Sequence, residues 1–147
     1  MDVKRVKRLQ PLVSLATQNE RDHAARLVEA ERRLVEASQR LEDLLRFRQE
    51  YERSFHDRAS SGTEMRSLRE SRLFIACLDD AVRAQEHQMD ELRGRVDAER
   101  EQWGAAATRK QVVAKVVERA TVEATSREAR FLQRELDERA AQRSVQR

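Results

Sequence analysis

The fold of this chain is decided by residues 27–55, which read LVEAERRLVEASQRLEDLLRFRQEYERSF. Two apolar rows recur there every seven residues, the second three residues after the first, and almost everything between them is charged or an amide. The rows are Leu27, Leu34, Leu41 and Phe55, and Ala30, Ala37, Leu44 and Tyr51. Such a heptad places one narrow apolar stripe along a helix, which needs a second helix to cover it. The stretch therefore predicts a coiled coil.

A second heptad in the C-terminal half of the chain supplies the partner. Its rows are Leu68, Ile75, Val82, Met89, Val96, Trp103, Val117, Ala124 and Phe131, and Leu78, Leu92, Ala106, Val113 and Ala120. Polar residues interrupt both stripes: Glu20, His23 and Arg48 in the first, and Gln85, Glu99 and Lys110 in the second. Long polar side chains can lay their stems along the seam between the helices and keep their charged ends in water. We therefore expect weaker pairing at these places, not its loss.

Residues 59–63, Ala-Ser-Ser-Gly-Thr, form the one turn signal of the sequence. Gly62 can adopt a left-handed backbone, and Ser61 and Glu64 have the spacing of a capping box that would begin a new helix. We predict an all-α fold, a long antiparallel two-helix coiled-coil hairpin that forms a single domain over residues 1–147. Helix one spans about 12–58, the turn 59–63 and helix two about 64–139, with a frayed tail at 140–147.

The two ends of the hairpin carry further expectations. The heptad phase extends back to Val6, so helix one either starts near residue 12 or continues further and bends at Pro11. The start near residue 12 is our prediction. Helix two is the longer, so residues beyond about 125 should form an overhanging C-terminal helix without a partner.

The heptads leave the register of the hairpin open. In an antiparallel pair, the numbers of opposed residues have a constant sum. A sum of 119 opposes Leu41 to Leu78, whereas a sum of 126 opposes Leu34 to Leu92. Both keep the apolar rows facing each other, so the sequence does not choose between them.

The composition suits long solvated helices. Charged residues make up 39% of the chain and aromatic residues 4%, a balance that disfavours sheets. Disorder is the competing interpretation, which the sustained heptads make the weaker one. The 30 basic and 27 acidic residues are mixed, without the basic face of a nucleic-acid-binding protein, and we interpret the basic run at residues 4–8 as a solvated helix start. No segment approaches the ~20 apolar residues of a membrane span.

The sequence offers no catalytic, cofactor-binding or metal-binding residues. The three glycines stand apart at 62, 94 and 104, so they cannot form a phosphate-binding loop. The three histidines lack ligand spacing, and Cys77 is the only thiol. A lone cysteine excludes an intramolecular disulfide and permits a reducing compartment. We expect an intracellular, non-enzymatic protein that needs no cofactor and binds other proteins.

Apolar residues in excess of what one seam can bury indicate where proteins bind. They are Val28, Val35, Leu45 and Phe47 in helix one, and Leu73, Phe74, Ile75, Val112, Val113, Val116 and Val117 in helix two. The alternative is that they widen the stripe within the hairpin or pair with a second copy.

Several short motifs of this chain resemble the FliJ family of flagellar export proteins. They are KRLQPL at 7–12, AARL at 24–27, LLRFRQEY at 44–51 and FIACLDDA at 74–81, followed by Trp103. The chain length, the order of the elements and the basic start also agree. The resemblance covers nearly the whole chain.

The resemblance implies a component of the type III protein export apparatus of the bacterial flagellum, which serves flagellum biogenesis, motility and chemotaxis. Its place would be the cytoplasm, peripheral at the cytoplasmic face of the inner membrane. FliJ-like proteins resemble the coiled-coil stalk subunit of rotary ATP synthases. They bind the centre of the flagellar export ATPase ring, promote its assembly and activity, and contact the export gate protein FlhA and export chaperones. The resemblance implies these partners for a monomeric hairpin. The mixed charges and the lack of an apolar span indicate that it binds no nucleic acid and does not insert into the membrane.

The gate-binding surface of the family corresponds to Phe74, Leu78, Ala81 and Gln85, spaced by four, three and four along one helix face. Family members can have His at the position of Gln85. Leu78 also belongs to the predicted seam, so packing is the alternative role for this residue.

Two other functions compete with the flagellar one. The first is the equivalent stalk of a virulence type III secretion system, which gene neighbourhood would distinguish. The second is a generic self-associating coiled-coil scaffold, which would form stable oligomers in sedimentation experiments.

Overall fold

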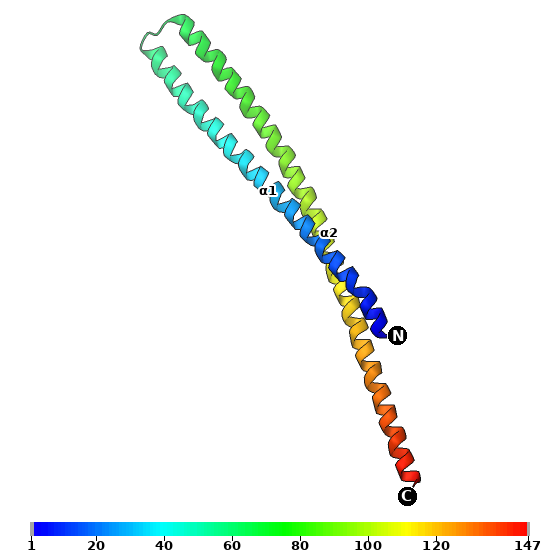
Figure 1. The fold of residues 1–147 in the computed structure, drawn as a ribbon. Helices are drawn as coiled ribbons and strands as arrows, with labels where there is room; N and C mark the ends of the chain where they lie inside the picture. The colour runs from blue at the N-terminus through cyan, green and yellow to red at the C-terminus, as the bar shows by residue number, and fades with distance from the viewer. Residues whose placement is uncertain (1, 147) are drawn as a thin grey trace. The chain divides into compact units, whose positions relative to one another are not determined.

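The computed structural model describes residues 2–146, with side chains from residue 3 onward. These residues form two α-helices, α1 (Asp2–Ser60) and α2 (Met65–Val145), of 59 and 81 residues (Figure 1). The helices pack against each other as an antiparallel hairpin, which confirms the predicted all-α coiled-coil fold. Helices of this length are possible because the chain has one proline and three glycines, the residues that disfavour helix interiors most.

Contacts divide the hairpin into two units, which we describe separately. The turn unit is Ala24–Glu101 and includes the connection between the helices. The terminal unit consists of the described parts of Met1–His23 and Gln102–Arg147. Each unit pairs a stretch of α1 with a stretch of α2, so each has a seam of its own.

The seam of the turn unit is formed by the predicted heptad positions. Its buried residues are Ala30, Ala37, Ser71, Leu78, Val82, Met89 and Val96. The other row positions of this unit, such as Leu34 and Leu92, are half-buried. The buried apolar residues of α1 are small alanines, whereas those of α2 are the larger Leu78, Val82, Met89 and Val96.

The seam of the terminal unit follows the same heptad but buries less. Its buried residues are Ala106 and Ala120. The polar row residues Glu20, His23 and Lys110 are half-buried, as the interruptions of the heptad predict. This unit therefore has less apolar side-chain volume to hold its helices together.

Contacts between the helices select one of the two registers. Tyr51 contacts Phe74, Arg48 contacts Asp79, and Glu20 contacts Trp103 and Lys110. Across the ring contacts, hydrogen bonds and ion pairs that join α1 to α2 within either unit, the paired residue numbers sum to values from 121 to 131. These values lie on both sides of 126 and always above 119. The register is therefore the one with a sum of 126.

The connection between the helices is residues 61–64, and it is held by hydrogen bonds to the end of α1. Gly62 has a φ of 79°, the left-handed conformation that glycine adopts without strain. The Thr63 N–H donates to the Arg58 carbonyl at 3.2 Å, the six-to-one bond of a Schellman motif. The Ser61 hydroxyl donates to the same carbonyl at 3.1 Å. Ser61 therefore closes α1 and does not form the capping box predicted for the second helix.

The start of α1 differs from the prediction. The helix begins at Asp2, about ten residues earlier than expected, and contains Pro11. Val6 and Leu9 explain this difference, because both lie on the heptad stripe and are half-buried. Packing against α2 stabilises the turns before Pro11, which isolated would be too short to persist.

The end of α2 also differs from the prediction. The helix continues unbroken to Val145, six residues beyond the predicted end near 139, and the stretch beyond 125 is part of α2. The sequence predicts fraying at 140–147, whereas the structure is helical as far as residue 145, and Arg147 lies outside the described residues. Every residue from 125 to 146 is exposed except Glu135, which is half-buried.

Candidate interaction surfaces

The candidate sites of this protein are exposed faces of its two helices. Within residues 2–146, no three His, Cys, Asp or Glu side chains are placed to hold a metal ion. Cys77 is an exposed free thiol. The described helices contain no stretch that is both long and apolar enough to cross a membrane. Open grooves lined by both helices lie beside the seam in each unit.

The four predicted gate-binding residues lie on α2 in the turn unit, but they are not equally accessible. Phe74 is 41% exposed, whereas Leu78 is 7% exposed and packs in the seam. Ala81 and Gln85 are half-buried. The Gln85 side-chain amide donates to the main-chain carbonyl of Ala37 on α1 at 3.0 Å. Phe74 is therefore the member that is free to contact a partner, and Leu78 holds the helix that carries it.

Phe74 belongs to a cluster of three aromatic rings contributed by both helices. We call Phe47, Tyr51 and Phe74 the aromatic cluster. The Phe74 ring centroid lies 4.6 Å from that of Tyr51 and 6.2 Å from that of Phe47, with an edge-to-face angle of 80° in the second pair. The sequence identifies Phe47 and Phe74 as surplus apolar residues and places Tyr51 in the seam. It does not join them, because their proximity depends on the register.

A shallow groove adjoins the aromatic cluster. It is lined by Arg40, Asp43, Leu44, Phe47 and Gln85, so both helices contribute to it. Gln85 reaches this groove from α2 and is fixed by its bond to α1. In the same unit the Arg48 guanidinium pairs with the Asp79 carboxylate at 3.0 Å, another link between the helices. The surface that contains Phe74 therefore rests on a well-bonded part of the seam.

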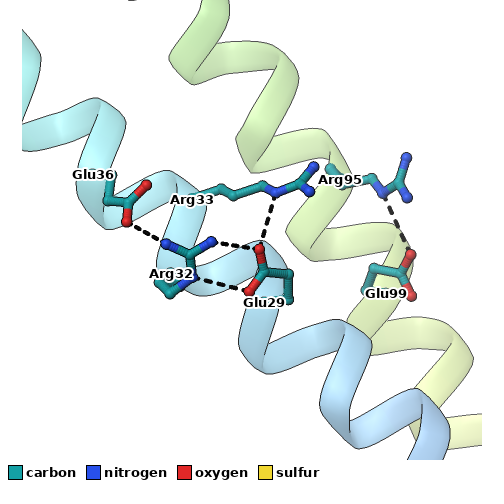
Figure 2. Close-up of polar contacts among 6 residues, drawn as sticks. All are labelled: Glu29, Arg32, Arg33, Glu36, Arg95 and Glu99. Carbon is teal, nitrogen blue, oxygen red and sulfur yellow. Dashed lines mark hydrogen bonds and ion pairs between the residues drawn. The ribbon is translucent and has the colours of Figure 1, made fainter.

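Exposed charges on α1 pair with one another along the helix (Figure 2). The Glu29 carboxylate accepts hydrogen bonds from Arg32 at 2.6 and 2.9 Å and from Arg33 at 3.2 Å, and Arg32 also pairs with Glu36. The Arg32 hydrogen bonds, with the nearby positive charges, lower the pKa of Glu29 from 4.5 to about 2. The carboxylates in turn raise the pKa of Arg32. These pairs are solvated and each contributes little, but they help α1 to remain helical.

Polar side chains also meet in the seam of the terminal unit. The Trp103 indole N–H donates to the Glu20 carboxylate at 3.0 Å, and the Lys110 ammonium lies 3.8 Å from its other oxygen. Among the described residues, Nδ1 of His23 is the one buried side-chain nitrogen or oxygen without a hydrogen-bond partner. Leaving such an atom unpaired costs about 1–3 kcal/mol. The terminal unit therefore buries fewer apolar side chains than the turn unit and is further destabilised by the unpaired nitrogen of His23.

Two long helices joined by a heptad seam, with aromatic and apolar side chains left on the outside, define a coiled-coil interaction protein. A family model described as Flagellar FliJ protein matches residues 5–147. The chain therefore belongs to the FliJ family and is a non-enzymatic component of the flagellar export apparatus. No curated protein and no solved structure matches the chain. The family resemblance carried by the short motifs is thus confirmed over nearly the whole length.

Proposed function

We propose that this chain is a monomeric stalk that binds the centre of the export ATPase ring, promotes its assembly and activity, and links it to the gate protein FlhA and to export chaperones. It would work in the cytoplasm, at the cytoplasmic face of the inner membrane. The observation that carries the proposal is the family match over residues 5–147. Two units with different surfaces support it, because a linking protein needs separate regions for separate partners.

We assign gate binding to the turn unit. Phe74 supplies an exposed aromatic ring, and the aromatic cluster adds Phe47 and Tyr51 from α1. Aromatic side chains on a rigid support are the residues that most often dominate binding energy at interfaces. Ala81 and Gln85 border this surface on α2, while Leu78 acts through packing, since it is buried.

Binding to the cytoplasmic part of the gate protein tests this assignment. Phe74→Ala should weaken binding about tenfold or more, as expected for an interface hot spot, with unchanged helicity by circular dichroism. Leu73→Ala is the matched control, because Leu73 is the adjacent exposed apolar residue. Equal affinity of the two variants would contradict the assignment.

We assign ATPase binding to the terminal unit. Its α2 segment from 125 to 146 is almost wholly exposed, which supports its projection as a single helix beyond the start of α1. A single helix is slender enough to enter the opening of a ring. The excess of basic residues in this unit, 15 against 9 acidic ones, distinguishes it from the turn unit, which has 15 against 18.

The decisive experiment mixes the chain with the cognate export ATPase and measures hydrolysis and ring assembly. We expect stimulation by the full chain, its loss on deletion of residues 126–147, and its retention by Phe74→Ala. Undiminished stimulation by the shortened chain would reverse the assignment of the units. No stimulation by the full chain would refute the ATPase function.

A further inference from the structure

A second apolar surface lies in the terminal unit, away from the residues that the family resemblance implicates. We call it the terminal groove. It is lined by Leu12, Leu15, Ala16, Asn19, Thr108, Arg109, Val112 and Val113, and has a volume of about 520 Å³. That volume is within the ~300–1,000 Å³ of small-molecule pockets, but those pockets enclose most of their ligand. The terminal groove lies open between two helices, so it suits a row of side chains from another protein.

The apolar side chains of this groove are surplus to the seam. Leu12 and Leu15 flank the seam positions Val13 and Ala16, and they are 49% and 67% exposed. On α2, Val112 in the groove is 55% exposed, and Val116, four residues further along the helix and outside the lining, is 43% exposed. Each helix thus adds a second apolar row beside its seam row, and an exposed apolar surface of this kind marks an interaction site.

Cations extend these rows on both helices. On α1, Arg5 and Arg8 precede Leu12 and Leu15 with spacings of three, four and three, which keeps all four on one helix face. On α2, Arg109, Val112, Val116 and Arg119 have the same spacings. Among the side chains of residues 3–146, none of these four arginines takes part in an ion pair or hydrogen bond. Their charges are therefore available to a partner.

We propose that the terminal groove binds an amphipathic α-helix of a partner protein, with apolar residues on one face and Asp or Glu on its flanks. Rows spaced by three and four residues on two neighbouring helices match the ridges of a third helix laid between them. Arginines pair with carboxylates through charge-assisted hydrogen bonds, which fixes the sign of the charge on the partner. The inference goes beyond the proposed function, since it rests on the groove and not on the ATPase or the gate.

The same observations disfavour two other occupants. A second copy would bring its own basic terminal unit against this one, and the like charges would repel. A membrane surface would meet a concave groove with Asn19 and Thr108 in its lining, where a lipid-binding helix instead presents a protruding apolar face.

A designed peptide tests the proposal. The probe is a fluorescein-labelled helical peptide of about three heptads, with Leu at the first and fourth positions and Glu at the flanking ones. We expect fluorescence anisotropy to show binding to the full chain, weakened at least tenfold by Leu15→Asp. Leu73→Asp is the matched control, because Leu73 is 68% and Leu15 67% exposed. It should bind the peptide as the unmodified chain does, because Leu73 lies in the turn unit. Circular dichroism should show equal helicity for both variants.

A charge exchange makes the test specific. The double variant Arg8→Glu/Arg119→Glu should weaken binding of the Glu-flanked peptide and improve binding of a Lys-flanked one. No binding of the Glu-flanked peptide, or equal binding of both peptides by the unmodified chain, would overturn the proposal. So would binding only to phosphatidylcholine–phosphatidylglycerol vesicles, or self-association that Leu15→Asp removes. The export ATPase is absent from the assay, so a failure of the proposed function leaves this result unaffected.

Discussion

The turn unit and the terminal unit share one heptad repeat but fill it differently. In the turn unit, six apolar residues and Ser71 are buried, and bonds such as Arg48 to Asp79 cross between the helices. In the terminal unit, two alanines are buried and Glu20, His23 and Lys110 occupy seam positions. The same periodicity therefore gives a firmly packed segment and a loosely packed one within a single hairpin.

The exposed side chains of the two units also differ in how firmly the seam beneath them is packed. The turn unit supports its aromatic cluster on a packed seam, which suits a surface that must keep its shape. The terminal unit leaves apolar rows outside a weak seam, together with the four arginines that extend them, which suits a surface completed by a partner. Stability and accessible binding surface are thus distributed to different places along the same two helices.

The largest effect should come from the seam of the turn unit. Leu78→Ala removes a buried side chain, so we expect a loss of about 2–3 kcal/mol in the free energy of unfolding, measured by urea titration followed by circular dichroism. Leu132→Ala in the terminal unit should stay within about 0.5 kcal/mol, because Leu132 is exposed. Similar losses for the two variants would show that Leu78 is not packed in the seam as the structure has it.

A smaller effect is expected from the polar contacts of the terminal unit. Trp103→Phe removes the indole N–H that donates a hydrogen bond to the Glu20 carboxylate. The loss should be about 1–2 kcal/mol of unfolding free energy in the same titration. Glu20→Gln keeps an oxygen that can accept this bond, so its loss should be the smaller of the two. A larger loss for Glu20→Gln would show that the Lys110 ion pair matters more than the indole bond.

The two seams should also open separately in the unmodified chain. We expect hydrogen exchange, followed by mass spectrometry of peptides, to give the terminal unit an opening free energy about 1 kcal/mol or more below that of the turn unit. Fluorescence of Trp103, the only tryptophan, offers a second local signal for the terminal unit. Uniform protection along both helices would remove the distinction.

The smallest effect should be the pH dependence of the α1 charge pairs. The pKa of Glu29 is lowered in the folded chain to about 2, below its ordinary 4.5, so its contribution is present above about pH 4.5 and is lost as the pH falls towards 2. Comparison of the unmodified chain with Glu29→Gln should show this difference in helicity, reduced by about 1 M NaCl because the pair is solvated. The difference should grow as the pH rises from about 2 to 4.5, and a difference that shrinks over that range would have the wrong sign.

Apart from the buried Ser71, which the predicted rows did not include, the buried residues could be predicted from the heptad, because burial follows the spacing of seven in both units. The apolar rows alone do not give the register, since shifting α2 by one heptad again places apolar rows opposite each other. What separates the two registers is polar: a sum of 119 opposes Glu20 to Glu99, whereas a sum of 126 opposes Glu20 to Ala106. Repulsion between two carboxylates in a seam disfavours the first alignment.

The candidate surface depended on that register. Phe74 could be found from sequence as an apolar residue in excess of the seam, but its contact with Tyr51 could not. Leu78 and Phe74 share a helix face by spacing, yet one is buried and the other exposed, since the seam covers only part of that face. The early start of α1 could not be predicted from local sequence either. Pro11 disfavours a helix interior, and packing against α2 is what stabilises the helix before it.

The short connection at Gly62 has a consequence for the newborn polypeptide. Residues 24–101 contain everything the turn unit needs, and they are synthesised before residues 102–147. Joining the outer stretches first would close a loop as long as the whole turn unit, at a higher entropic cost than growth from the bend. We expect the two helices to pair outward from Gly62. The basic N-terminal segment of α1 is therefore synthesised first and packs against α2 last.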